Sequence, residues 1–161
     1  MAAVIRRARD GDEKRVAEFA IRLFQQHVDY DAERFSTFAD VQGAEKFYRS
    51  RFDTKDSAVF VAESDEVVVG FAYVELDERN YAQLLENGAW LHDIYIDDSA
   101  RKEGLGSGLI KAAAEAMRQK GAKKLLLTVA AKNMAAQQAF EKAGFRPTMV
   151  EMTLNLPDSL Q

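Results

Sequence analysis

The spacing of apolar residues along the chain switches several times between the two-residue period of strands and the period of about 3.6 residues that is typical of helices. Residues 3–8 alternate apolar and basic side chains and predict a short first strand. Helical spacing then predicts a helix over residues 10–27 and a second one over 42–52. Residues 57–63 and 67–76 predict two further strands. The second of these is apolar at most positions, so we expect it near the middle of a sheet.

The second half of the chain has a regular order of strands and helices. A strand is expected at 89–97, and a glycine-rich stretch after it opens a helix that ends near Gly121. A strand at 123–130, a helix from Asn133 to Gly144 and a closing strand at 148–156 complete the prediction. A strand, helix, strand sequence of this length forms a right-handed unit, so the strands at 89–97 and 123–130 should be parallel neighbours.

Length and composition fit one mixed α/β domain over residues 1–161. With 47% hydrophobic and 30% charged residues, the chain resembles soluble globular proteins. No apolar run approaches the about 18 residues of a membrane span, and the first residues lack the apolar core of a signal peptide. We therefore expect a cytoplasmic protein with no membrane partner.

The net charge and the numbers of cysteine and histidine residues bear on binding of nucleic acid, charged substrates and metals. The net charge of −4, without a basic stripe, argues against nucleic acid. It mildly favours a cationic substrate, although an acidic surface that keeps the protein soluble explains it equally well. The chain has no cysteine and two histidines, so no metal is expected.

The glycine-rich stretch lies where the predicted strand passes into the predicted helix. It reads Arg101-Lys102-Glu103-Gly104-Leu105-Gly106-Ser107-Gly108-Leu109. Free N–H groups at the start of a helix, with glycines that let a ligand approach the backbone, form a phosphate-binding geometry. The glycine spacing fits neither the dinucleotide fingerprint nor the Walker motif.

Two motifs in this half resemble those of the GNAT superfamily, the acyl-CoA-dependent N-acyltransferases. The first is R/Q-x-x-G-x-G/A, matched by Arg101, Gly104 and Gly106. The second is N-x-x-A-x-x-x-[YF]-E-x-x-G-F, matched by Asn133, Ala136, Phe140, Glu141, Gly144 and Phe145. Together they cover roughly residues 89–147, whereas the first half of the chain has a compatible element order but no specific motif.

The resemblance implies a central mixed twisted sheet flanked by helices, with a splayed central pair of parallel strands. It also implies an N-acetyltransferase in which a primary amine attacks acetyl-CoA directly. The loop would hold the pyrophosphate and the preceding strand the pantetheine arm. The residues implied in acetyl-CoA binding are Ile94, Tyr95, Ile96, Arg101, Lys102, Glu103, Gly104, Leu105, Gly106, Ser107, Asn133 and Phe140. For Asn133, the alternative is a helix N-cap without a ligand.

The attacking amine has to lose a proton, which requires a base or a water chain. His92 lies on the strand where family members often place such a base, and a histidine side chain accepts a proton near neutral pH. Asp93 or solvent is the alternative. Strand alternation would place His92 on one face with Trp90 and Ile94, and would place Asp93 and Tyr95 on the other.

Phe140 stands where many members of the family have a tyrosine that protonates the leaving thiolate. Water or Tyr95 would have to take over that role. The same departure favours an alternative function, a non-catalytic acyl-CoA-binding or sensing module. The irregular acidic and aromatic segment 29–39 is either one wall of the acceptor site or a plain surface loop.

The closing strand carries an expectation about assembly. Val150, Met152, Leu154 and Leu156 would lie on one face of it, and such a strand at the edge of a sheet needs cover. We therefore expect a homodimer.

Overall fold

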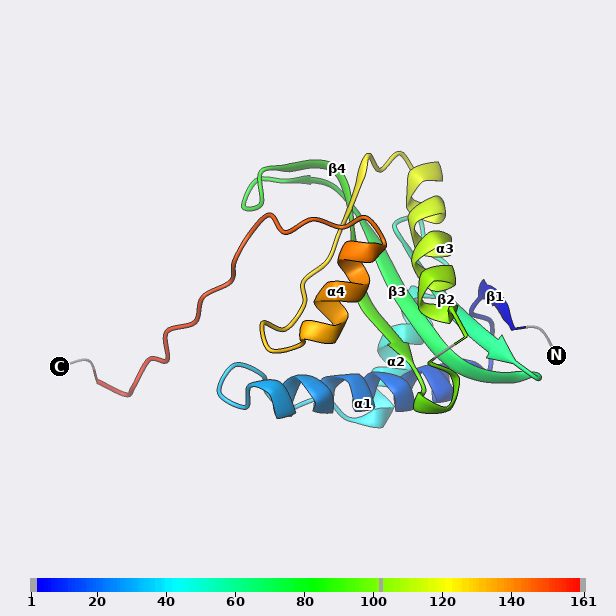
Figure 1. Cartoon of the computed structure of the whole chain (residues 1–161), viewed down its shortest axis with the longest axis horizontal. Helices are drawn as coiled ribbons and strands as arrows, with labels where there is room; N and C mark the ends of the chain where they lie inside the picture. The colour runs from blue at the N-terminus through cyan, green and yellow to red at the C-terminus, as the bar shows by residue number, and fades with distance from the viewer. Residues whose placement is uncertain (1–2, 102, 160–161) are drawn as a thin grey trace. The chain divides into compact units, whose positions relative to one another are not determined.

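The computed structural model describes residues 3–101 and 103–159. The elements in chain order are β1 (Val4–Arg7), α1 (Glu13–Tyr30), α2 (Val41–Arg51), β2 (Ser57–Ser64), β3 (Val67–Asn80), β4 (Leu85–Ile96), the 3-10 turn η1 (Asp98–Ala100), α3 (Leu105–Gln119), β5 (Lys124–Leu126) and α4 (Met134–Lys142) (Figure 1). The strands form one sheet in the order β1-β2-β3-β4-β5. Neighbours are antiparallel except β4 and β5, which are parallel. The predicted mixed sheet and its parallel pair are confirmed.

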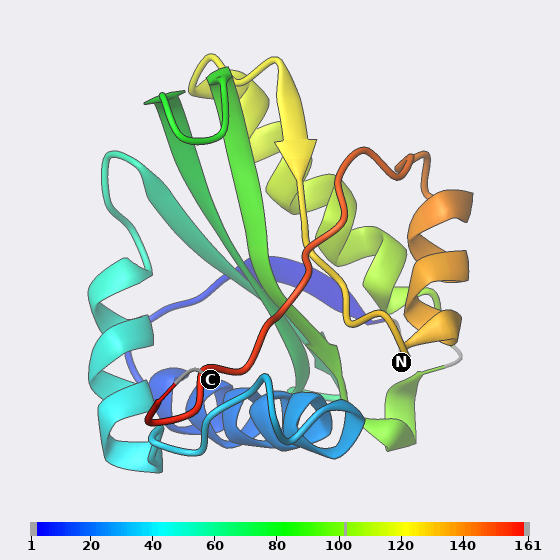
Figure 2. The same cartoon turned by 90° about the vertical axis from the view of Figure 1, so that its left-hand side faces the viewer.

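Helices cover both faces of this sheet (Figure 2). On one face, α3 contributes Leu109, Ala113 and Met117 to the main apolar core, which they share with residues of β2, β3 and β4. On the other face, α1 contributes the buried Phe19 and α2 the buried Tyr48. Both faces of β3 are therefore covered, as its nearly continuous apolar sequence predicted.

Helix α1 begins at Glu13 rather than at the predicted Asp10. Residues before it form a turn, in which the Asp12 N–H donates to the Arg9 carbonyl oxygen at 3.0 Å. The Asp12 carboxylate accepts hydrogen bonds from the Arg9 N–H at 2.8 Å and from both terminal nitrogens of Arg6 at 2.8 and 3.2 Å. Arg6 also bonds Glu63 on β2 at 2.8 Å, so this cluster ties the start of α1 to the first two strands.

The β3–β4 hairpin is longer than the sequence indicated. Residues 77–88 were expected to be a polar connection with a turn at Asn87-Gly88, yet strand pairing continues to Asn80↔Leu85 and the turn is at 81–84. The polar side chains here support the pairing, since Arg79 bonds Glu86 across the strands at 2.8 Å. Polar residues are compatible with a hairpin that extends beyond the core.

The residues group into two compact units. The first, residues 1–23 and 39–128, holds the whole sheet with α2, α3 and most of α1. The second comprises residues 24–38 and 129–161, including α4. None of the residues of α4 is buried. A single domain over the whole chain stays a prediction.

The predicted closing strand at 148–156 is wrong. Within the part of the chain that the structure describes, these residues pair with no strand, and Met149, Val150, Met152, Leu154 and Leu156 are 73–89% exposed. Strand β5 is also shorter than the predicted 123–130. A period-two pattern shows that a segment is suited to a strand, but whether the strand forms depends on pairing with another part of the chain, which the pattern does not contain.

Candidate active site

Strands β4 and β5 diverge after a short stretch of pairing. The parallel ladder comprises Gly88↔Lys124, Ala89↔Leu125 and Trp90↔Leu126. On its other side β4 stays paired with β3 as far as Gly70↔Ile96. Beyond Trp90, one edge of β4 therefore has no strand beside it among the described residues. This edge, which includes Ile94, Tyr95 and Ile96, is suited to accept an extended ligand such as a pantetheine chain.

The glycine loop places a helix start at the end of this edge. Gly104 is the N-cap of α3, with φ 72° and ψ 15°, a left-handed conformation that glycine adopts most readily. Gly104 itself has no side chain that could cap the helix. Apart from chain neighbours and the helix's own backbone, a Cβ built on Gly104 or Gly106 would meet no atom of residues 3–101 and 103–159 within 4 Å, so space is open beside the first turn. Free N–H groups, the helix dipole and open space fit a pyrophosphate.

Some of the other loop residues make contacts that stabilise the turn, and others are exposed to solvent. Arg101 Nε donates to the Ile96 carbonyl oxygen at 3.1 Å and lies 3.0 Å from Asp98, so it braces the turn. Leu105 is buried in the core, which leaves only its backbone for a ligand. Glu103 and Ser107 are exposed, and Lys102 lies outside the described residues.

Gly108, which follows the motif, has a packing role. A Cβ at this position would lie 2.9 Å from Cγ1 of Ile5 on β1. The close approach of α3 to β1 therefore requires glycine here.

A β-bulge in β4 changes the directions of its side chains from those that strict alternation predicted. Tyr73 pairs with Asp93 and Val74 with Leu91, which leaves His92 as the extra residue. His92 stacks on Tyr73 with ring centroids 5.2 Å apart, while Asp93 accepts a hydrogen bond from Tyr48. Strict alternation would have separated His92 from Asp93, but the bulge brings both to one aromatic cluster.

This cluster includes two tyrosines that the sequence did not single out. Tyr48 on α2 is 1% exposed and donates to Asp93 Oδ2 at 2.7 Å, and its ring meets that of Tyr73 edge-on at 5.9 Å. Tyr73 donates to Glu75. Burial, with the neighbouring carboxylates, raises the pKa of both tyrosines well above the ordinary value. Each hydroxyl therefore keeps its proton and acts as a donor.

No local sequence signal could have identified Tyr48. It fits the apolar spacing of its helix, and it lies 45 residues from the carboxylate that it bonds. Tyr95 is also buried, and its ring packs against Phe19 at 5.3 Å. This burial favours a packing role, so proton donation by Tyr95 stays a prediction.

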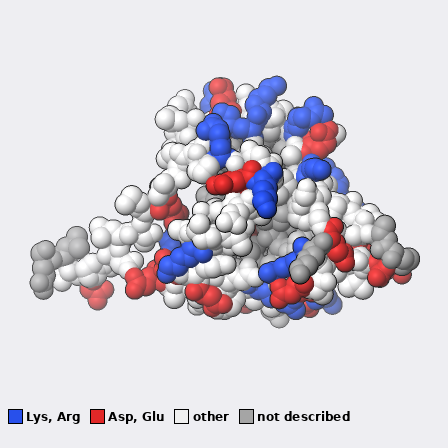
Figure 3. Space-filling view, viewed as in Figure 1, with Lys and Arg blue, Asp and Glu red and all other residues white. Residues whose placement is uncertain are grey.

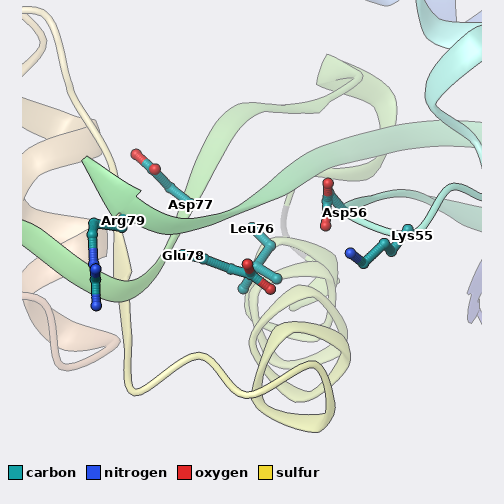
Figure 4. Close-up of a pocket in the computed structure, with 6 residues that line it drawn as sticks. All are labelled: Lys55, Asp56, Leu76, Asp77, Glu78 and Arg79. Atoms are coloured by element: carbon teal, nitrogen blue, oxygen red, sulfur yellow. The ribbon is translucent and has the colours of Figure 1, made fainter.

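A separate polar hollow of about 300 Å³ lies near the hairpin end of β3 (Figure 4). Its lining residues are Lys55, Asp56, Leu76, Asp77, Glu78 and Arg79. These residues of β3 are six to nine positions beyond Gly70, which at about 3.3 Å per residue is roughly 20–30 Å from the glycine loop end. The hollow therefore lies away from the glycine loop.

The candidate residues of the second unit have structural contacts within it. Asn133 Oδ1 accepts from the Ala136 N–H at 3.1 Å, which is the N-cap arrangement. Phe140 packs against Phe145 with ring centroids 5.8 Å apart. Contact of Asn133 or Phe140 with acetyl-CoA stays a prediction.

The last features concern surface charge, metal binding and membrane-spanning helices. Acidic and basic side chains are intermixed on the face shown in Figure 3. Within residues 3–101 and 103–159, no group of histidine and acidic side chains is placed to hold a metal ion. No helix of the described part is long and apolar enough to cross a membrane.

Comparisons with known proteins agree with this geometry. The chain is 28% identical over 155 residues to the uncharacterised N-acetyltransferase YhfO of Bacillus subtilis, covering 95% of this chain and 97% of that protein. A mutant of the BH1408 protein from Bacillus halodurans has a TM-score of 0.82 at 18% identity, with 96% and 99% of the two chains covered. The aminoglycoside N-acetyltransferase AAC(6')-Iy in complex with CoA has a TM-score of 0.79 at 17% identity, with 96% and 95% covered.

At these identities the two solved structures establish the likeness of fold. The family follows from a sequence model, that of the acetyltransferase (GNAT) family, which matches residues 24–145 and thus most of the chain. The opened strand pair, the glycine at the start of α3 and this match lead to one conclusion: the chain belongs to the GNAT family of acetyltransferases.

Proposed function

We propose that the chain transfers the acetyl group of acetyl-CoA to a primary amine at the opening between β4 and β5. The observation that carries the proposal is the edge of β4 beyond Trp90↔Leu126, which runs towards the start of α3, where the N-cap, Gly104, is left-handed. The free edge of β4 suits the pantetheine arm, and the amides of residues 105–107 suit the pyrophosphate. A thioester carbonyl held by the same arm would lie along β4.

The chemistry needs a proton acceptor and a stabilised oxyanion. The amine attacks the thioester carbonyl, the C–S bond of the tetrahedral intermediate then breaks, and the amine proton passes to a base. His92 is exposed and its ring is oriented by Tyr73, so it is our candidate for the base or for holding the water that acts as one. A strand N–H such as that of Ile94 is our candidate donor to the oxyanion.

Asp93 is the second candidate for the base. It lies next to His92 in the bulge, and the Tyr48 hydroxyl orients its carboxylate at 2.7 Å. The departing thiolate would take its proton from water, because Phe140 has none to give.

The acceptor class and the setting are also proposed. The acidic chain, with Asp93 half-buried near His92, favours a cationic amine, either a small molecule or a peptide. We propose cytosolic action without a metal, nucleic acid or a membrane.

Release of free thiol from acetyl-CoA, measured across a panel of amines, tests the function. We expect amine-dependent release by the parent, whereas a non-catalytic acyl-CoA-binding module would bind CoA and release none. His92→Ala should lower turnover about 10²- to 10⁴-fold and change the pH profile of the rate, with little change in acetyl-CoA affinity.

The chain offers a matched control for this variant. His27→Ala removes the other histidine, which lies at the end of α1, and should keep the parental pH profile. If His92→Ala retains the parental turnover and profile, the role of base passes to Asp93 or to solvent.

A further inference from the structure

The carboxylate of Glu75 on β3 lies in aromatic surroundings close to the candidate base. Tyr73, two residues earlier on the same face of the strand, donates a hydrogen bond to this carboxylate and stacks with its ring on His92. Trp90 on β4 pairs directly with Glu75, so its side chain lies on the same face of the sheet. All of these residues belong to the first compact unit. One tyrosine therefore connects the carboxylate with the histidine.

The charge of Glu75 is not paired within the described part of the chain. Its side chain is half-buried, and a carboxylate that loses part of its hydration is stabilised by a nearby cation. Asp12 and Glu63 share Arg6 as such a partner. Glu75 instead accepts a hydrogen bond from the neutral hydroxyl of Tyr73 and forms no ion pair with a described residue.

Arg51, the last residue of α2, does not supply the missing cation. Its guanidinium carbon lies 5.2 Å from the centroid of the Phe47 ring. Its Nε is buried without a hydrogen-bond partner among residues 3–101 and 103–159, and it forms no ion pair with Glu75. The position beside the Glu75 carboxylate therefore remains available to a cation from outside the chain.

The neighbouring rings indicate which kind of cation fits. The Trp90 ring is fixed by a hydrogen bond from its Nε1 to Asp77 at 3.1 Å. Phe47 meets Tyr73 edge-on at 5.6 Å and is 42% exposed. Aromatic faces attract organic cations, tryptophan most strongly, whereas a metal ion such as calcium needs about six or more oxygen ligands. One carboxylate among aromatic side chains is therefore suited to an ammonium group.

We propose that Glu75 selects the acceptor by binding a second cationic group of it, while the reacting amine lies at His92. This rests on the proposed acetyl transfer, which places the reacting amine there. His92 stacks on Tyr73, and Glu75 lies two residues further along β3, a distance of about 7 Å. With bonds of about 1.5 Å, about four or five methylene groups separate two nitrogens by roughly this distance. The substrate class is thus a linear diamine or polyamine.

A series of linear diamines, from ethylenediamine to octamethylenediamine, tests this selection in the thiol assay. We expect kcat/KM to be highest for about four or five methylene groups. A monoamine of equal length, with a methyl group in place of the second amine, should have a kcat/KM lower by about 10- to 100-fold. Glu75→Gln keeps an oxygen that accepts from Tyr73 but loses the charge, and should reduce this preference about tenfold or more. An unchanged preference in this variant, or none in the parent, would overturn the role of Glu75.

Glu78→Gln is the matched control. It removes the same charge from the same strand, but from the opposite face, where Glu78 is exposed. This variant should keep the parental preference, and circular dichroism checks that both variants fold. An equal loss of preference in both would contradict a specific role for Glu75.

Calorimetric titration of tetramethylenediamine into the CoA-bound protein separates the binding site from the reaction. If the parent binds the diamine, Glu75→Gln binds it about tenfold or more weakly, and no amine is acetylated, then the proposed transfer fails and the cation site stands. Equal affinity of the two proteins, or no binding by the parent, would rule out the site even in an active enzyme.

Discussion

Gly104→Asp tests whether the start of α3 binds the pyrophosphate of acetyl-CoA. The residue has φ 72°, and a side chain there would enter open space rather than the core. A left-handed conformation costs a non-glycine residue roughly 1–2 kcal/mol, and aspartate tolerates it better than most. The interaction of a carboxylate with the helix dipole at the N-terminus stabilises the fold by about 0.3–1 kcal/mol and offsets part of this cost. The expected loss of stability is therefore about 1 kcal/mol or less.

The effect on binding should be much larger. A carboxylate roughly 5–6 Å from one phosphate charge, at an effective dielectric constant of about 20, costs about 3 kcal/mol. This corresponds to a loss of about 100-fold in CoA affinity, and a second phosphate charge adds to it. Titration calorimetry with CoA measures the affinity, and thermal unfolding measures the stability.

Gly121→Asp is the matched control, because Gly121 follows the C-terminal end of the same helix. It also has a positive φ, 100°, and open space around its Cβ. Its φ lies beyond the ordinary left-handed range, and a negative charge at a helix C-terminus is unfavourable, so this variant should lose more stability, about 2–3 kcal/mol. It should nevertheless bind CoA like the parent once folded. If Gly104→Asp also binds CoA within about threefold of the parent, the phosphate site is elsewhere.

Three further variants probe other parts of the chain. Tyr48→Phe removes the hydroxyl that donates to Asp93, and should lower the free energy of unfolding by about 1.5–3 kcal/mol in denaturant titration. If catalysis requires Tyr48 to orient Asp93, kcat should fall more than the affinity for CoA. Phe140→Tyr should raise kcat in the thiol assay if protonation of the thiolate limits turnover, and should leave it unchanged if deprotonation of the amine does. Burial alone would raise the pKa of Asp12, but hydrogen bonds from Arg6 and from the Arg9 N–H outweigh it and hold the pKa below its ordinary value. The ionised Asp12 carboxylate therefore stabilises the fold above about pH 4, and this stabilisation is lost as the pH falls further. The Asp12→Asn variant should have a free energy of unfolding about 3 kcal/mol lower at pH 7. Its free energy of unfolding should also change less than that of the parent as the pH is lowered.

The sequence predicted those features of the site that depend on neighbouring residues. Gly104 could be identified because the glycine pattern lies between a predicted strand and a predicted helix, and the βαβ order made β4 and β5 parallel. Where β4 and β5 separate could be inferred only from the family resemblance, because nothing in their apolar patterns marks Trp90 as the last paired residue.

Features that depend on contacts between residues far apart in the sequence could not be predicted from it. The bulge at His92 exists only relative to β3, so a simple alternation along β4 assigned its side chains to the wrong faces. The contact between Tyr48 and Asp93 joins a helix and a strand 45 residues apart. Residues 148–156 have the alternating pattern of a strand, but a pattern cannot show whether a partner strand is present in the same chain.

The short ladder between β4 and β5 has a thermodynamic consequence. Three residue pairs make it the shortest junction in the sheet, so it should open more readily than the long β3–β4 hairpin. A pantetheine arm bonded along the free edge of β4 would substitute for the ladder that is missing there. By mass action, a ligand at 100 times its dissociation constant stabilises the native state by about 2.7 kcal/mol. The resistance of this protein to unfolding would then rise with the concentration of acetyl-CoA.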